Sequence, residues 1–305
     1  MISSMKRLTR SLLAAILIGL STAVHVTPLL LVAVVKMIFR TGTVRRWCDR
    51  WLMRIAENWI GFNSWMIDHL TDTRIEVEGM PDSSREGHLL VLCNHQSWVD
   101  IPVLQKLFNR RLPLLRFFLK SQLIWVPLLG LAWWALDFPF MKRYSKQMLA
   151  RRPELAGRDV EATRKACAKF RDIPVAIMNF VEGTRFRPDR HQAQQSPYRH
   201  LLKPRSGGIA FVFDALGDSI DTIVDVTIAY PGFDRSPPGL PDLFANRITE
   251  IRVSIRTLQV PDFFRDLDYQ NDPADRQRFQ AWVNGLWRQK DETCERLLAA
   301  SEIDP

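Results

Sequence analysis

The sequence predicts an α/β protein: a mainly parallel central sheet flanked by helices and preceded by an N-terminal helical membrane anchor. Three observations support this fold class. Residues 11–35 carry no charged side chain. From about residue 73 onward, short β-rich runs alternate with helical runs, which is typical of a parallel sheet covered by helices. The chain has 305 residues, of which 47% are hydrophobic, so it can bury a core without disulfides or metals.

Residues 11–35 are long enough to cross a bilayer, which takes roughly 20 apolar residues. Pro28 and its polar neighbours interrupt the segment, and because proline removes a helical hydrogen bond, two shorter helices fit as well as one. Basic residues flank both ends, and positive charge favours the cytoplasmic side. A re-entrant hairpin and a single span therefore both remain open. A cleaved signal peptide is a third interpretation, opposed by the second apolar half and the arginines that follow it.

Four tryptophans lie among arginines in the next stretch, residues 44–70, and this composition is typical of an interfacial helix. An ordinary amphipathic core helix is the alternative. The chain shows neither an internal repeat nor a low-complexity linker. We therefore expect a membrane anchor with an interfacial helix at residues 1–70 and one catalytic domain at residues 71–305.

The elements of the second region follow from β-branched or aromatic runs bounded by turn residues and from helical periodicity between them. Strands are expected at residues 74–79, 88–94, 137–142, 175–180, 222–230 and 248–260. Helices are expected at residues 98–109, 121–135, 144–151, 158–172, 205–215 and 272–299. Two polar, turn-rich stretches, 189–204 and 233–241, are expected to be loops. The apolar segment 127–140 is expected in the core rather than in a membrane.

Charge and cysteine usage narrow the class of protein. The chain has 42 Lys and Arg against 33 Asp and Glu, a net charge of +9, which favours an anionic partner. Nucleic acid would explain the charge but not the apolar segment, so anionic lipid is the better candidate. Four scattered cysteines without metal-ligand spacing indicate a reduced, cytosol-facing protein and no metal site. These features argue against a secreted disulfide scaffold, a zinc finger and a multi-span transporter.

The stretch VLCNHQSWVDIP at residues 91–102 carries a candidate catalytic pair. His95 follows a buried strand, and Asp100 lies five residues later in the first turn of the next helix. Across such a turn the two side chains can converge, and a carboxylate on one imidazole nitrogen leaves the other nitrogen as a base. No GxSxG motif supplies a protein nucleophile. Ser97 is expected to cap the helix, so we expect the base to act on a hydroxyl of the substrate.

Three further stretches place basic groups at the ends of strands or helices. MNFVEGTRFRP at 178–188 combines a flexible glycine with an arginine, which suits the approach and bidentate binding of a phosphate. DFPFMKR at 137–143 and LLKPRSGGIAF at 201–211 add lysines and arginines. Each alone fits a solvated basic edge equally well. Together with a general base, they are what a phosphate-bearing alcohol substrate requires.

The order and spacing of four blocks resemble the glycerolipid acyltransferases, the PlsC-like 1-acylglycerol-3-phosphate acyltransferases with the signature NHxxxxD. The blocks are NHQSWVD, DFPFMKR, FVEGTRF and IVDVTIAYPG, over roughly residues 75–232. Two positions depart from the family pattern. Val181 stands where the family usually has proline, and Asp225 where an apolar residue or proline is commoner.

This resemblance implies that His95 is the general base on the acceptor hydroxyl and that Asp100 orients it. It implies an acyl-thioester oxyanion met by loop N–H groups around Gly183 and Thr184. Glu182 would repel a phosphate, so it is expected to anchor an arginine or the loop. The set that the resemblance assigns to the acceptor's phosphate is Arg143, Glu182, Gly183, Thr184 and Arg185.

The implied reaction moves a fatty acyl group from acyl-CoA or acyl-carrier protein to lysophosphatidic acid, giving phosphatidic acid. No metal and no cofactor beyond the acyl donor is implied, and the expected location is the inner (cytoplasmic) membrane with the active site facing the cytoplasm. Remodelling of another lysophospholipid, such as lysophosphatidylglycerol, keeps the chemistry and changes the acceptor. A non-catalytic anionic-lipid-binding protein and a thioester hydrolase are the alternatives from other classes.

Overall fold

The computed structural model describes residues 2–39, 41–80, 87–141, 151–152, 174–233 and 237–299. Its centre is a six-stranded sheet in the order β1-β8-β7-β2-β6-β3. Parallel pairing joins β2 to β6 and β7, β3 to β6, and β1 to β8, while β7 and β8 run antiparallel. The predicted mainly parallel sheet is confirmed. The strands are β1 (Arg74–Glu78), β2 (His88–Cys93), β3 (Leu115–Phe117), β6 (Val175–Phe180), β7 (Ile220–Ala229) and β8 (Glu250–Leu258), with β4 (Leu119–Lys120) and β5 (Phe140–Met141) forming a separate pair.

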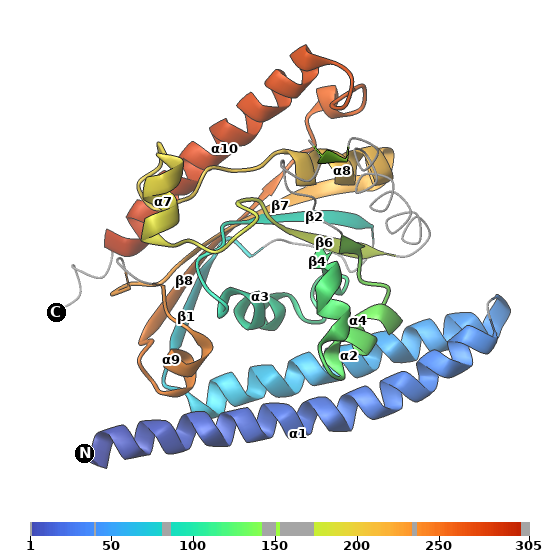
Figure 1. Cartoon of the computed structure of the whole chain (residues 1–305), viewed down its shortest axis with the longest axis vertical. Helices are drawn as coiled ribbons and strands as arrows, with labels where there is room; N and C mark the ends of the chain where they lie inside the picture. The colour runs from blue at the N-terminus through green and yellow to red at the C-terminus, as the bar shows by residue number, and fades with distance from the viewer. Residues whose placement is uncertain are drawn as a thin grey trace.

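Helices cover both faces of this sheet (Figure 1). On one side lie α1 (Ile2–Ile38), α2 (Gly42–Leu70), α3 (Asp100–Phe108) and α4 (Leu129–Ala135). On the other lie α8 (Gly207–Leu216) and α10 (Pro273–Ala299). The shorter elements are α7 (Pro188–Gln194), α9 (Leu240–Phe244), η1 (Ser121–Trp125), η3 (Gly217–Ser219) and η4 (Asp262–Phe264).

The central strand β2 supplies both cores. Leu89, Val91 and Cys93 pack into the core shared with α1 to α4, whereas Leu90 and Leu92 pack into the core beneath α8 and α10. Side chains alternate between the faces of a strand, so a strand covered on both sides reads as a continuous apolar run. That burial is why the sequence of β2 shows no polar alternation.

The N-terminal segment forms one continuous helix with Pro28 inside it, so of the two alternatives left open by the sequence the structure shows the single helix. Its polar side chains hydrogen-bond to the carbonyls of the preceding turn: Thr22 to Ile18, and Thr27 to Ala23. Because these groups are satisfied within the helix, they do not interrupt it. The chain reverses after α1 instead, and α2 packs along α1 (Figure 1). The stretch Arg7–Ile38 is the one helix among the described residues that is long and apolar enough to cross a membrane.

The boundary predicted at residue 70 separates helices from sheet but does not separate two cores. Side chains of α1 and α2 share one hydrophobic cluster with the sheet and α3. The division into an anchor and a catalytic domain stays a prediction.

Several predicted elements differ in the structure. The helix expected at 121–135 is split into η1 and α4 because Pro127 lies between them and Leu128 has a φ of 62°. The strand expected at 137–142 is reduced to β5, which pairs with β4 instead of the central sheet. The segment 127–140, expected in the core, is divided: Ala132 and Ala135 are buried, whereas Leu131 and Trp134 are exposed.

Other differences lie in stretches interpreted as loops. Helix α7 begins at Pro188, one residue before the stretch 189–204, and extends into it to Gln194, while α9 begins at the end of 233–241. The edge strand β3 was not predicted. The helices expected at 144–151 and 158–172 lie outside the described residues, except for residue 151.

Candidate active site

The turn after β2 is fixed at its first residue by Asn94, which is fully buried. The side-chain amide donates to the backbone carbonyl of Ile228, and its oxygen accepts the Ile228 N–H, both at 2.9 Å. Asn94 thereby imitates one more rung of the β2–β7 ladder. The next residue, His95, is thus held at the carboxyl end of the central strand.

The structure brings His95 and Asp100 together. His95 Nδ1 lies 2.8 Å from Asp100 Oδ2, and the same oxygen accepts the N–H groups of Gln96 at 2.8 Å and Ser97 at 2.9 Å. The hydroxyl of Tyr230 donates to Asp100 Oδ1 at 2.6 Å. A carboxylate only accepts, so Nδ1 carries the imidazole proton and Nε2 carries the lone pair. His95 is therefore oriented as a base.

Ser97 has a different role from the expected helix cap. Helix α3 begins at Asp100 without a side-chain cap, and Ser97 Oγ accepts the Val99 N–H at 2.9 Å within the turn. The hydroxyl also donates to the Pro238 carbonyl. Ser97 shapes the turn that carries His95 and joins it to the segment before α9.

One face of the His95 ring packs against Phe180, the last residue of β6. The two rings stack with centroids 3.9 Å apart and planes 14° from parallel. The His95 side chain is 12% exposed. Nε2 makes no hydrogen bond to another described residue, which leaves its lone pair unused by the protein.

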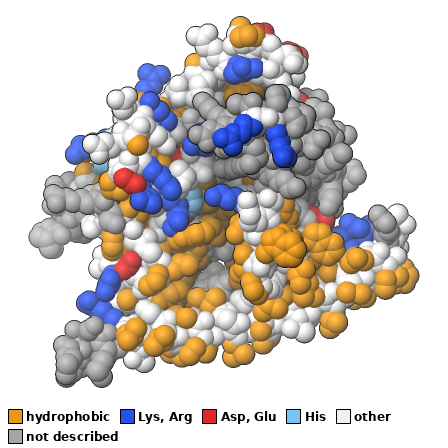
Figure 2. Space-filling view, in the orientation of Figure 1, with side chains coloured by type: hydrophobic (Ala, Val, Ile, Leu, Met, Phe, Trp, Pro, Cys, Tyr) orange, Lys and Arg blue, Asp and Glu red, His pale blue; other side chains and the backbone are white. Residues whose placement is uncertain are grey.

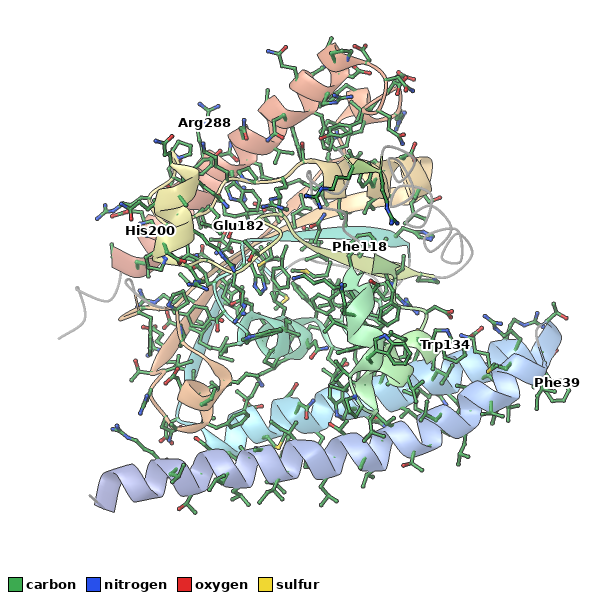
Figure 3. All side chains as sticks on the ribbon, in the orientation of Figure 1. Phe39, Phe118, Trp134, Glu182, His200 and Arg288 are labelled. Carbon is green, nitrogen blue, oxygen red and sulfur yellow. The ribbon has the colours of Figure 1, made fainter. Side chains whose placement is uncertain are left out.

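Glu182 lies beneath the neighbouring loop, fully buried (Figure 3). Neither carboxyl oxygen makes a hydrogen bond of normal geometry to another described residue. Burial raises the pKa of Glu182 well above its usual range, and the charge of Asp100 adds to the rise, while the N–H groups of His95 and Leu202 oppose it. Both carboxyl oxygens of Glu182 are buried, so neither is exposed to a substrate. Its position fits the expectation that it supports the loop.

The other predicted residues of this loop, Gly183, Thr184 and Arg185, each make a different contact. Gly183 has a φ of 69° and donates its N–H to the Phe180 carbonyl at 2.8 Å. This N–H was expected to meet the thioester oxyanion, but the hydrogen bond to Phe180 already occupies it. Thr184 Oγ1 accepts from Arg190. The guanidinium of Arg185 lies over the Trp98 ring, 4.4 Å from its centroid. Arg143 and its neighbour Lys142 lie outside the described residues.

A pocket of about 620 Å³ opens beside this loop. Its described lining contains three cations, Lys120, Arg190 and Arg205, and no carboxylate. Such a pocket suits an anion. The full lining is Lys120, Gln122, Gly183, Thr184, Arg190, Ala193, Gln194 and Arg205.

Sequence reasoning missed Lys120, Arg190 and Tyr230 as site residues. Tyr230 stands in the fourth block, IVDVTIAYPG, and that position was the available signal. Nothing local marks Lys120 or Arg190. Cys93, next to the turn, is fully buried, and burial raises its thiol pKa well above the usual range, so it is no nucleophile. Within the described ranges, no group of three or more His, Cys, Asp or Glu side chains is arranged to hold a metal ion.

Comparison with known proteins gives a consistent picture. A family model described as "Acyltransferase" matches residues 74–231, more than half of the 305-residue chain. The 1-acyl-sn-glycerol-3-phosphate acyltransferase epsilon of Mus musculus is 24% identical over 244 residues, covering 73% of this chain and 61% of the relative. The 2-acyl-1-lysophosphatidylinositol acyltransferase of Saccharomyces cerevisiae is 25% identical over 264 residues, covering 72% and 64%. The chain spans about three fifths of the length of these relatives.

A solved structure shares the fold. The 1-acyl-sn-glycerophosphate acyltransferase PlsC from Thermotoga maritima superposes with a TM-score of 0.53 at 18% sequence identity, covering 93% of this chain and 98% of that one. At this identity, the match supports the arrangement of sheet and helices, including the N-terminal ones.

Proposed function

This chain belongs to the acyltransferase family, and from that premise we propose that it moves a fatty acyl group from a thioester to the free hydroxyl of a lysophospholipid. The observation that carries the proposal is His95, held by Asp100 through Nδ1 while Nε2 makes no hydrogen bond to another described residue. The Phe186 N–H donates to the His95 carbonyl at 2.7 Å, and so joins this turn to the loop after β6, whose Gly183 and Thr184 line the cationic pocket. The base and the anion site together fit an alcohol that bears a phosphate.

In the proposed reaction, Nε2 of His95 takes the proton of the acceptor hydroxyl as its oxygen attacks the thioester carbonyl. The tetrahedral intermediate collapses, the carbon–sulfur bond breaks, and the imidazolium returns the proton to the leaving thiolate. Asp100 stabilises the imidazolium while it exists. General-base assistance of this kind is worth about 10²- to 10⁴-fold in rate.

Lys120, Arg190 and Arg205 would hold the phosphate of the acceptor. We propose lysophosphatidic acid as the acceptor and phosphatidic acid as the product, because the Mus musculus relative is named for that reaction. The Saccharomyces cerevisiae relative is named for a lysophosphatidylinositol, so a different lysophospholipid is the second candidate. Acyl-CoA or acyl-carrier protein would be the donor.

We further propose that α1 attaches the protein to the cytoplasmic face of the inner membrane, where acceptor and product reside. One side of α1 is apolar and exposed, and the tryptophans of α2 flank it. Figure 2 shows hydrophobic side chains gathered on this side of the molecule and lysines and arginines above them.

The test is thiol release from acyl-CoA by membranes that hold the wild type, His95→Ala or His69→Ala. His69 lies exposed on α2 and serves as the matched control. Each is assayed with lysophosphatidic acid, with lysophosphatidylglycerol and with no acceptor. We expect acceptor-dependent release that is lost in His95→Ala alone. Release without an acceptor would indicate a thioesterase. Equal acceptor-dependent release by wild type and His95→Ala would contradict the role of His95, and no release by either protein would favour a non-catalytic lipid-binding protein.

A further inference from the structure

The segment that follows β4 displays four large apolar side chains to solvent. Trp125 is 85% exposed, Leu128 42%, Leu131 50% and Trp134 46%. They recur every third residue, and we name them together the α4 apolar face. Figure 3 shows Trp134 on α4, close to the two N-terminal helices.

The backbone holds these side chains outward. Leu128 has a φ of 62°, a backbone region that residues with a side chain rarely adopt. At Gly130 a Cβ would lie 2.0 Å from the carbonyl oxygen of Ile124, so only glycine fits the turn between η1 and α4. Ala132 and Ala135 pack inward. The exposure is therefore a fixed feature of the fold.

The α4 apolar face is fastened to α1. Lys36 near the end of α1 is buried, donates to the Ala135 carbonyl at 3.3 Å and pairs with Asp137 at 2.6 Å. Figure 2 shows the hydrophobic surface running from the helices at the base onto α4 without a charged strip between them. On α1 this surface includes Leu20, Val24, Leu31, Val34 and Met37.

We propose that the α4 apolar face is a second membrane contact, inserted into the same leaflet that α1 occupies; this rests on the membrane attachment proposed above. Tryptophan on such a face suits the boundary between headgroups and acyl chains. A helix alone leaves the molecule free to roll about the helix axis. A second contact on a separate element removes that freedom.

The contact also bears on the reaction, because the same short segment forms one wall of the cationic pocket. Lys120 and Gln122 line the pocket, and Trp125 follows within one turn of η1. Insertion of Trp125 would set the pocket at the level of the lipid headgroups. The phosphate of a membrane-embedded acceptor would then reach Lys120 while its acyl chain stays in the bilayer.

The test places an environment-sensitive fluorophore on single cysteines in a Cys167→Ser background, since Cys48, Cys93 and Cys294 are buried. The labelled variants are Trp125→Cys, Leu20→Cys on α1, and Arg288→Cys on the far side of the molecule (Figure 3). Vesicles contain equal parts of phosphatidylcholine and phosphatidylglycerol. We expect a blue shift and quenching by acyl-chain nitroxides at positions 125 and 20, and neither at position 288.

The outcomes separate the two proposals. A shift at position 20 without one at position 125 would overturn the second contact and leave membrane attachment standing. No shift at either position would overturn attachment itself. A concentration-dependent shift at position 125 without vesicles would identify a second copy of the chain as the occupant, and would also overturn the proposal.

A pair of variants connects the contact to activity. Trp125→Ser with Trp134→Ser should lower acyl transfer to vesicle-embedded acceptor about ten-fold or more at limiting vesicle concentration, because less apolar area is buried. Transfer to a short-chain, water-soluble acceptor should be unchanged. Trp125→Phe with Trp134→Phe should keep both activities. Equal losses on both acceptors would indicate a folding defect and contradict a membrane role.

Discussion

The turn after β2 and the loop after β6 each bury a carboxyl group close to His95, and the two groups are treated differently. Asp100 accepts hydrogen bonds from His95, from two backbone N–H groups and from Tyr230. Glu182 is equally buried and makes no hydrogen bond of normal geometry to another described residue, and its pKa is raised.

The comparison separates the effect of burial alone on a carboxyl group from the effect of burial together with hydrogen-bond donors. Removing a carboxylate from water is costly unless protein groups replace the water, and otherwise the group takes up a proton. Protein donors take the place of water at both carboxyl oxygens of Asp100, so Asp100 can accept the hydrogen bond of the imidazole. Glu182 is suited to filling space under the loop in its neutral form.

The largest expected effect comes from Asp100→Asn. The amide oxygen can still accept from His95, Gln96 and Ser97, and the amide nitrogen can face Tyr230, so the geometry is kept while the charge is lost. We expect kcat to fall by about 10²- to 10⁴-fold with little change in melting temperature. Tyr230→Phe, which removes one of the four donors, should cost about ten-fold. Full activity of Asp100→Asn would contradict the role of the pair.

A third buried carboxyl, Asp225, sharpens the comparison because cations neutralise it. Lys290, fully buried on α10, lies 2.6 Å from it, and Arg256 lies 2.6 Å from its other oxygen. Lys290→Met should lower the free energy of unfolding by about 1–3 kcal/mol, because one oxygen of Asp225 and the Val226 carbonyl lose a buried donor while Arg256 still pairs with the other oxygen. The double variant Asp225→Asn with Lys290→Met should recover much of this in a thermal melt. A single variant as stable as wild type would show that the pair is not needed.

Asp225 also shows how sequence reasoning reaches its limit. Asp225 departs from the family pattern because it pairs with Lys290, which lies 65 positions later on a helix outside the matched blocks. The His95–Asp100 pair was predictable because a strand, a turn and a helix start bring close neighbours in sequence together. Tyr230, Lys120 and Arg190 were not, because only the sheet order and the loops that follow it bring them to the site.

Similar limits apply to the fold. Strands β2, β6, β7 and β8 were predictable from apolar or β-branched runs of at least six residues, whereas the edge strand β3 spans only three residues, too few to show a period. Pro28 left one helix and two helices open, because the sequence does not show that the nearby Thr22 and Thr27 side chains bond to carbonyls of their own helix. Segment 127–140 misled because hydrophobicity alone does not distinguish a buried residue such as Ala132 from an exposed one such as Trp134.

The smallest effect tests the protonation of Glu182 directly, through the pH dependence of stability. A carboxyl whose pKa is raised in the folded state binds a proton that the unfolded chain releases above about pH 4.5. The stability that it contributes is full below that pH and is lost as the pH rises toward the folded-state pKa, by at most about 1.4 kcal/mol per pH unit. Glu182→Gln removes the titration, so its free energy of unfolding relative to wild type should rise with pH.

Glu78 is the matched control for that measurement, because Arg296 lowers its pKa. For Glu78 the sign reverses: its contribution is present above its unfolded pKa and is lost as pH falls, and it is small because the pair is exposed to solvent. Glu78→Gln should therefore be slightly less stable than wild type at neutral and high pH, and the difference should vanish in acid, where the wild-type carboxyl is protonated as well. If Glu182→Gln instead loses stability at neutral pH, the buried carboxyl is charged there, and the distinction between it and Asp100 fails.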